Sequence, residues 1–141
     1  MRIDGIWFIC DDGVSRPIFW AEVQAANGEW LKAPFLADCG ADRTVLSANV
    51  ISGLGLIVLE DEKALSGIGG IVPSGVCSTR IRIPNSEGTP VSFRGQFSAV
   101  VGSDYLDMSL LGRDITNNFA LVVDGPGDTV CLLYRGEIYQ A

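Results

Sequence analysis

The sequence predicts an all-β fold, and three observations support this prediction. Short runs rich in Val, Ile, Phe and Trp alternate with Gly, Pro, Asn and Asp, which is typical of short strands joined by turns. The chain contains 17 glycines, so residues suited to turns are plentiful. Its 141 residues are enough for one hydrophobic core and too few for two independent ones. We therefore expect a single domain that covers residues 1–141.

The first expected element is a hairpin in the segment RPIFWAEVQAANGEWLKAPFLAD. Asn27 and Gly28 tolerate the positive φ angles of a type I′ turn, which would join strands at 18–25 and 30–37. The second of these strands delivers Asp38 at its end.

A short helix is expected next, in SANVISGLGL. Ser47 is suited to begin a helix and Gly53 to end one, so the helix is predicted at 47–52. It is too short to be stable alone and must pack on the sheet. A strand, a glycine-rich tip at 67–70 and a return strand toward Ile83 follow.

The rest of the chain continues the β pattern. Two further strands are expected near 91–101, and MSLLGRDITNNF predicts a strand, a glycine and a short helix near 113–118. The tail predicts a hairpin with the turn DGPGD at 124–128, and one last strand after it.

Composition excludes several classes of function. The net charge of −7, with ten basic residues scattered among 17 acids, argues against a nucleic-acid partner. Apolar runs such as IWFIC at 6–10 are far too short to span a membrane, and no signal peptide is visible. Four cysteines without a C-x-x-C pair indicate reduced thiols and a cytoplasmic protein.

The sequence contains no histidine. Ser-His-Asp and Cys-His catalysis and the common zinc sites with histidine ligands are therefore excluded. If the chain is a hydrolase, its acid and base must be carboxylates or lysines. Apolar residues make up 48% of the chain and charged residues 19%, so part of the surface is expected to meet a partner.

Three segments carry a resemblance to a known family: FLADCGADRTVL, SGIGG and SLLGRDI. Together they resemble the retropepsin-type aspartic proteases, viral and virus-like enzymes that act as symmetric dimers of one β-rich domain. The resemblance covers roughly residues 18–124. It implies a retropepsin-like closed β-barrel with a flap hairpin and one or two short helices.

The resemblance makes Asp38 the catalytic acid of an aspartic endopeptidase. Peptide hydrolysis by water needs one group that accepts a proton and another that donates one, and two close carboxyls share a proton because both cannot ionise. The chain has one such acid turn, so the second carboxylate would come from a second copy on a two-fold axis. The implied enzyme is a homodimer that takes a peptide or protein substrate and needs no metal or organic cofactor.

The resemblance also implies roles for other residues. Asp42 would form a buried or half-buried ion pair with Arg113 that braces the active turn. Ile68 would lie at the flap tip between flexible glycines, and the peptide would bind as an added strand. The implied substrate-binding positions are Gly40, Ala41, Asp42, Ile68, Gly69, Gly70 and Leu110, and Cys39 and Arg113 would give structural support.

The sequence departs from the family at Cys39, where Thr or Ser is usual. The hydroxyl at that position braces the dimer beneath the carboxylates, and a thiol is a weaker donor and acceptor. One alternative is therefore a silent dimerisation or peptide-binding module on the same fold, and another is a β-barrel ligand carrier. For the dimer sheet, the candidate segments are the apolar ends IWFIC and CLLYRGEIY.

Overall fold

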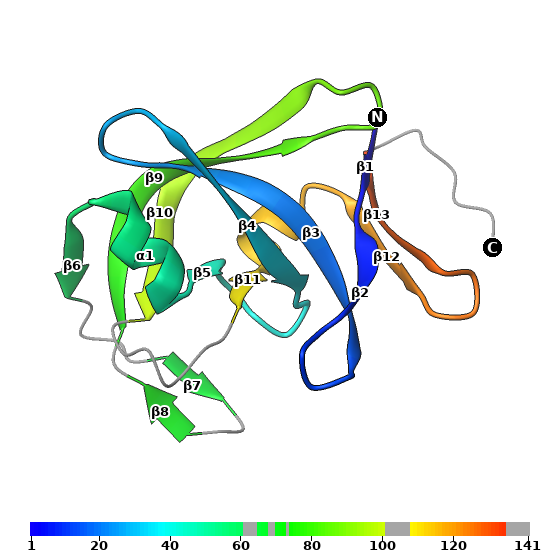
Figure 1. Ribbon diagram of the computed structural model, residues 1–141, viewed down its shortest axis with the longest axis horizontal. Helices are drawn as coiled ribbons and strands as arrows, with labels where there is room; N and C mark the ends of the chain where they lie inside the picture. Colours follow the sequence, from blue (N-terminus) through cyan, green and yellow to red (C-terminus); the bar gives the residue numbers. More distant parts are fainter. Residues whose placement is uncertain (61–64, 68–69, 73, 101–107, 135–141) are drawn as a thin grey trace.

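The computed structural model describes residues 1–60, 65–67, 70–72, 74–100 and 108–134, in which the strands form three sheets (Figure 1). The strands are β1 (Arg2–Asp4), β2 (Ile6–Ile9), β3 (Ser15–Gln24), β4 (Trp30–Ala37), β5 (Val45–Leu46), β6 (Val58–Glu60), β7 (Leu65–Gly67), β8 (Gly70–Val72), β9 (Ser74–Pro84), β10 (Pro90–Val100), β11 (Ser109–Leu111), β12 (Ala120–Asp124) and β13 (Thr129–Leu133). The helices are α1 (Ala48–Leu54) and α2 (Arg113–Thr116). The prediction of an all-β fold with short helices is confirmed.

The largest sheet closes on itself. Its strands follow the order β2-β3-β4-β11-β5-β10-β9-β6, and β9 also pairs with β3. Because of this additional pairing, the six strands from β3 to β9 form a closed barrel. The predicted closed β-barrel is therefore confirmed.

The barrel interior is filled by alternate residues of its strands. On β3, Phe19, Ala21 and Val23 are buried, whereas Trp20 is exposed and Glu22 half-buried on the other face. This alternation is the pattern of a strand with one face on the core. The same core includes Ile3, Ala33, Phe35, Leu46, Val50, Leu54, Cys77, Ile81, Ile83, Phe97, Ala99, Leu111, Ile115, Val130 and Leu132. Burying each large side chain contributes about 1.5–3 kcal/mol.

The hairpins β2–β3, β3–β4 and β9–β10 have the same kind of loop, in which a glycine with positive φ lies shortly before the second strand. Gly13, Gly28 and Gly88 have φ of 80°, 86° and 82°, and each N–H donates to the carbonyl three residues earlier at 2.9–3.0 Å. The type I′ turn predicted at Asn27-Gly28 is wrong, because that turn needs positive φ at both residues and Asn27 does not have it. The loop is one residue longer and ends in a glycine bulge.

Helix α1 extends further than predicted. It spans Ala48–Leu54, and Gly55 at φ 63° ends it in the left-handed conformation. Gly53, the predicted end, lies inside the helix, where a Cβ atom would be 3.2 Å from Leu31 Cδ2. Its small size therefore permits close packing of α1 on β4. Ser47 does precede the helix, but its side chain makes no capping hydrogen bond.

Other predictions can be compared with the described residues. The two strands expected near 91–101 are a single strand, β10, which pairs along its length with β9. Helix α2 ends at Thr116, two residues before the predicted end. The flap hairpin is present as β7 and β8, whose last pair is Gly67 with Gly70. Ile68 and Gly69 at its tip, and the last strand expected after 134, lie outside the described residues.

A three-stranded sheet stands at one end of the molecule, in the order β1-β13-β12 (Figure 1). β12 and β13 form the predicted hairpin around the DGPGD turn, and β13 also pairs with β1. The N–H of Tyr134 donates to the carbonyl of Met1 at 3.0 Å, so the first residue and the last described residue are neighbours. No helix in the described part of the chain has the length and apolar character that crossing a membrane requires.

Candidate active site

The candidate site lies where two parallel strands end side by side. β4 pairs in parallel with β11, and the register places Ala37 opposite Leu111. The chain leaves both strands at the same edge, so Asp38 and Gly112 are brought together across 74 residues of sequence. The N–H of Asp38 donates to the carbonyl of Leu111 at 3.1 Å, which fixes the start of the acid turn.

The acid turn holds its carboxylate with a backbone donor. Asp38 is half-buried, and its Oδ1 accepts a hydrogen bond from the Gly40 N–H at 3.0 Å. The N–H of Ala41 donates to the Asp38 carbonyl at 3.2 Å and closes the turn. A Cβ atom on Gly40 would lie 3.2 Å from Asp38 Oδ1, so glycine allows the backbone to approach the carboxylate closely. The side chain of Cys39 is exposed.

Arg113, the first residue of α2, holds both sides of this turn. Its Nη1 donates to the carbonyl of Cys39 at 2.8 Å, and its Nη2 forms an ion pair with Asp42. Its backbone N–H donates to the carbonyl of Ala41 at 2.9 Å. The predicted pairing of Asp42 with Arg113 is present, but the expected burial is wrong in this chain, because the two side chains are 84% and 42% exposed. An exposed pair contributes only about 0–1 kcal/mol by itself.

A second brace, which the sequence analysis missed, lies behind the turn. Thr44 is fully buried, and its Oγ1 donates to Asp114 Oδ1 at 2.7 Å while it accepts from the Gly112 N–H at 3.0 Å. The Thr44 N–H also donates to both oxygens of Asp114, at 2.9 and 3.0 Å. One hydroxyl therefore ties the end of β11 to the segment that leads into β5. The sequence offered one signal for this brace, which is the position of Asp114 in the first turn of α2. The N-terminus of a helix favours a negative charge, so an acid there is a candidate for a structural role.

Other carboxylates near the turn are already engaged. Asp42 is paired with Arg113, and Asp114 accepts hydrogen bonds from Thr44 and from the Ile115 N–H. In contrast, the one hydrogen bond to the Asp38 carboxylate among the described residues comes from the turn itself. Among the described residues of this edge, Asp38 is thus the carboxylate that no side chain engages.

The structure places the described site residues in one cluster and at two separate positions. Asp38, Cys39, Gly40, Ala41, Asp42 and Arg113 form one continuous cluster. Leu110 is half-buried on β11, where it pairs with Leu36 and Val45. Gly70 lies on the flap strand β8, while Ile68 and Gly69 lie outside the described residues.

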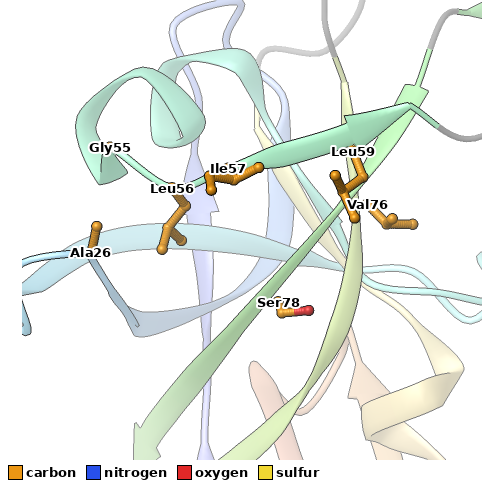
Figure 2. Close-up of a pocket in the computed structure, with 7 residues that line it drawn as sticks. All are labelled: Ala26, Gly55, Leu56, Ile57, Leu59, Val76 and Ser78. Carbon is orange, nitrogen blue, oxygen red and sulfur yellow. The ribbon is translucent and has the colours of Figure 1, made fainter.

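An apolar pocket of about 520 Å³ lies elsewhere on the barrel (Figure 2). It is open to solvent between the segment that follows α1 and strand β9, and Ile57 and Leu59 on its rim are 80% and 60% exposed. The lining residues are Ala26, Gly55, Leu56, Ile57, Leu59, Val76 and Ser78. None of the acid-turn residues contributes to it, so this pocket is separate from the candidate active site.

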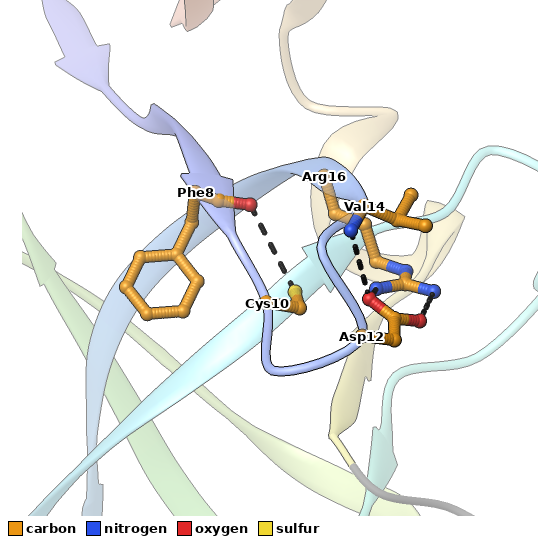
Figure 3. Close-up of polar contacts among 5 residues, drawn as sticks. All are labelled: Phe8, Cys10, Asp12, Val14 and Arg16. Atoms are coloured by element: carbon orange, nitrogen blue, oxygen red, sulfur yellow. Dashed lines mark hydrogen bonds and ion pairs between the residues drawn. The ribbon is translucent and has the colours of Figure 1, made fainter.

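A charged pair joins the loop between β2 and β3 to the start of β3 (Figure 3). Arg16 Nη1 and Nη2 donate to the two oxygens of the Asp12 carboxylate, at 2.9 and 2.7 Å, and the Val14 N–H donates to Asp12 Oδ1 at 3.0 Å. The hydrogen bonds from Arg16 and from the Val14 N–H lower the pKa of Asp12 to about 2. Burial raises the pKa of the Cys77 and Cys131 thiols.

Comparisons with known proteins agree with this fold. The family model described as retroviral aspartyl protease matches residues 14–123. The EIAV protease, solved in complex with the inhibitor HBY-793, superposes with a TM-score of 0.57 at 21% identity, over 77% of this chain and 93% of that chain. A retropepsin-like aspartic protease from Rickettsia conorii superposes with a TM-score of 0.57 at 23% identity, over 95% of this chain and 90% of that chain. At these identities the two structures establish the fold alone, and no curated protein sequence matches the chain significantly.

Proposed function

The chain belongs to the retroviral aspartyl protease family, and from this premise we propose that it is an aspartic endopeptidase that acts as a homodimer. The observation that carries the proposal is the position of Asp38. It is half-buried at the end of β4, held by its own turn, while the neighbouring acids Asp42 and Asp114 are engaged. Among the described residues at this edge, a single chain therefore presents one unengaged carboxylate, whereas peptide hydrolysis needs two.

In the proposed mechanism, two copies of Asp38 meet at a two-fold axis and share one proton. The ionised carboxylate takes a proton from a water molecule as its oxygen attacks the peptide carbonyl carbon. The protonated carboxyl donates its proton to the carbonyl oxygen, which gives a tetrahedral intermediate with two hydroxyls. As the C–N bond breaks, the carboxyl that took the proton from water donates it to the leaving nitrogen. The other carboxylate accepts a proton from one hydroxyl, so the shared proton of the pair is restored. Close carboxylates favour the shared proton because two adjacent negative charges repel each other. We expect activity to be higher at acidic pH for this reason.

The peptide would bind as an extended strand beneath the flap hairpin. Backbone hydrogen bonds along the added strand supply affinity, and apolar pockets for alternate side chains supply specificity. Leu110, half-buried on β11 next to the acid turn, is our candidate for lining one such pocket. The flap strands β7 and β8 are antiparallel, as a closing hairpin requires.

The test of catalysis is the variant Asp38→Asn, assayed against a peptide library with cleavage products identified by mass spectrometry. Loss of the general acid–base pair predicts a rate lower by about 10²–10⁴-fold. The control is Glu87→Gln, which removes one negative charge from an exposed hairpin loop that contributes nothing to the acid turn. Cleavage by Asp38→Asn at the wild-type rate would falsify the proposal.

A second candidate function is a silent dimerisation or peptide-binding module, and the exposed Cys39 favours it. The thiol stands where a hydroxyl would brace the dimer beneath the carboxylates, and it is the weaker hydrogen-bonding group. The variant Cys39→Thr separates the two candidates. A clear gain in cleavage indicates an enzyme weakened by its thiol, whereas peptide binding without cleavage in both variants indicates the silent module.

A further inference from the structure

The apolar pocket of Figure 2 takes no part in the proposed mechanism, and it lies on the outer face of the barrel. The register of β6 and β9 places Leu59 directly opposite Val76, and both side chains line the pocket. Their neighbours Val58 and Cys77 pack in or against the core. Because successive residues of a strand face opposite sides, Leu59 and Val76 face outward. The pocket is therefore part of the molecular surface.

The rim of the pocket is apolar and well exposed. Ile57 is 80% exposed and Leu59 is 60% exposed. Sites for small molecules typically bury about 70–90% of the ligand surface. A small molecule in this open pocket would leave much of its own surface and of both rim side chains in water. A polypeptide segment is large enough to fill the pocket and cover the rim, and exposed apolar patches mark such interaction sites.

Two arginines continue this outer face beyond the pocket. Ser78 lines the pocket on β9, and Arg80 is the next residue of the strand on the same face, about 7 Å further along. The register of β9 and β10 places Arg94 directly opposite Arg80. Among the described residues, neither side chain has an acidic partner or a hydrogen bond. Like charges that face each other on a sheet are destabilising, so this arginine pair lowers the stability of the free chain.

The next arginine on β9 differs from this pair because it has partners. Arg82 Nε donates to Glu22 Oε1 at 3.0 Å, and Arg82 Cζ lies 3.9 Å from the centre of the Trp30 ring. In the described part of the chain, the arginine pair has neither kind of contact. The whole chain carries a net charge of −7, so most of its surface repels an acidic partner. The arginine pair attracts one and thereby selects where it binds.

We propose that the pocket and the arginine pair form one docking site for a segment of a partner protein in which aliphatic side chains stand next to Asp or Glu residues. An aliphatic side chain fills the pocket against Leu59 and Val76, and the neighbouring carboxylates bind Arg80 and Arg94 through charge-assisted hydrogen bonds. An apolar centre with a charged rim is the usual anatomy of a protein interface. The docking site is separate from the acid turn and needs no catalytic activity.

A membrane surface fits these observations less well than a peptide does. The exposed Ile57 and Leu59 could insert into lipid, and the arginine pair could bind anionic headgroups. However, Glu60 directly follows Leu59 on β6, so a flat anionic surface that contacts Leu59 also meets this carboxylate. The net charge of −7 repels such a surface as well. A peptide that extends from the pocket along β9 leads away from Glu60 and reaches the arginine pair.

The test measures binding of a fluorescently labelled peptide, Asp-Asp-Leu-Leu-Asp-Asp, to the full chain by fluorescence anisotropy at neutral pH. We expect saturable binding that weakens as salt is added, because the arginine contacts are open to solvent. In Arg80→Gln the dissociation constant should rise about tenfold, since hydrogen bonds to a charged group are lost. Mass spectrometry checks that the peptide stays intact during the measurement.

Two control variants match the changes in the site. Arg16→Gln removes the same charge in the β2–β3 region, which lies away from β6 (Figure 1), and should leave the dissociation constant unchanged. Ile57→Ser removes an exposed aliphatic side chain from the pocket and should raise the constant about tenfold. Ile9→Ser removes an aliphatic side chain that is 72% exposed on β2, outside the pocket, and should have no effect.

Thermal denaturation distinguishes the docking role of the arginine pair from a structural role. The two guanidinium groups repel each other, so Arg94→Gln should be at least as stable as the wild type. The same variant should bind the peptide about tenfold more weakly. A less stable Arg94→Gln that keeps the wild-type dissociation constant shows a structural role and overturns the proposal.

Other results would also overturn it. They are the absence of saturable binding, equal binding by the wild type, Arg80→Gln and Ile57→Ser, and equal binding of Asp-Asp-Ser-Ser-Asp-Asp, which lacks the aliphatic side chains. A chain that sediments with phosphatidylglycerol vesicles but ignores the peptide identifies a membrane as the partner instead. In NMR spectra the added peptide should shift the amide signals of Leu59 and Ser78. Shifts confined to Asp38 and Gly40 place the peptide at the acid turn and contradict the docking site.

Discussion

Removing the Thr44 hydroxyl tests whether the contacts behind the acid turn stabilise the fold. Replacing Thr44 with valine keeps the shape of the side chain and removes one donor and one acceptor. Two contacts are lost: the bond to Asp114 Oδ1 at 2.7 Å and the bond from the Gly112 N–H at 3.0 Å. We expect the end of β11 to lose its attachment to the segment before β5.

The structure gives the size of this effect. The Asp114 carboxylate is partly exposed and keeps its bonds from the Thr44 and Ile115 N–H groups, so losing the hydroxyl donor costs about 1 kcal/mol. The Gly112 N–H is buried and is left without an acceptor, which costs about 2 kcal/mol. The free energy of unfolding should therefore fall by about 3 kcal/mol in Thr44→Val.

Urea unfolding at one fixed protein concentration measures this change, with tryptophan fluorescence and circular dichroism as probes. Thr44→Ser retains the hydroxyl and should lose about 1 kcal/mol or less. Thr129→Val removes an exposed hydroxyl bond to the Gly127 carbonyl and should change stability by about 0.5 kcal/mol at most. A Thr44→Val protein within about 1 kcal/mol of the wild type would refute the reasoning.

Two further predictions concern the site and the β2–β3 loop. In Gly112→Ala the new Cβ atom would lie 2.5 Å from the Arg43 carbonyl oxygen. We therefore expect the free energy of unfolding to fall by about 3 kcal/mol, or the variant to fail to fold. In the control Gly125→Ala the new Cβ atom contacts nothing, so its thermal denaturation should match that of the wild type. The Asp12 carboxyl should titrate with a pKa of about 2 in an NMR experiment, and Arg16→Gln should raise that pKa toward 3.8. The pKa of Asp12 is lower in the folded chain than its ordinary value of 3.8. The ionised carboxylate therefore stabilises the folded state fully at pH values above 3.8, and this stabilisation is lost as the pH falls toward 2. An unchanged Asp12 titration in Arg16→Gln would contradict the assigned cause.

The sequence predicted features that depend on neighbours along the chain. The strand at 30–37 has the predicted bounds, because alternating apolar residues and a preceding turn define it locally. The hairpin around DGPGD was predicted for the same reason. The helix end was misplaced because SGLGL offers two glycines, and only the packing of Gly53 against Leu31 distinguishes them.

The sequence did not predict features that depend on contacts between residues far apart in the chain. The contact between Thr44 and Asp114 joins residues 70 positions apart and requires β4 and β11 to be parallel neighbours. The pairing of β13 with β1 was not predicted, because it depends on where the returning hairpin lies in the fold. The single domain, the roles of the site residues and the cytoplasmic location stay predictions.

The meeting of Met1 with Tyr134 has a consequence for engineering. Since the N–H of Tyr134 donates to the carbonyl of Met1 at 3.0 Å, a chain shortened to residues 1–134 could be closed into a ring by a short linker. The ring could then be cut in the exposed loop at Gly88 to create a new N-terminus and C-terminus. A Cβ atom added at Gly88 would contact no other atom, so the loop has space for this change. The same geometry suits residues 1–134 for insertion into a surface loop of a host, because the two junctions, at Met1 and Tyr134, are neighbours.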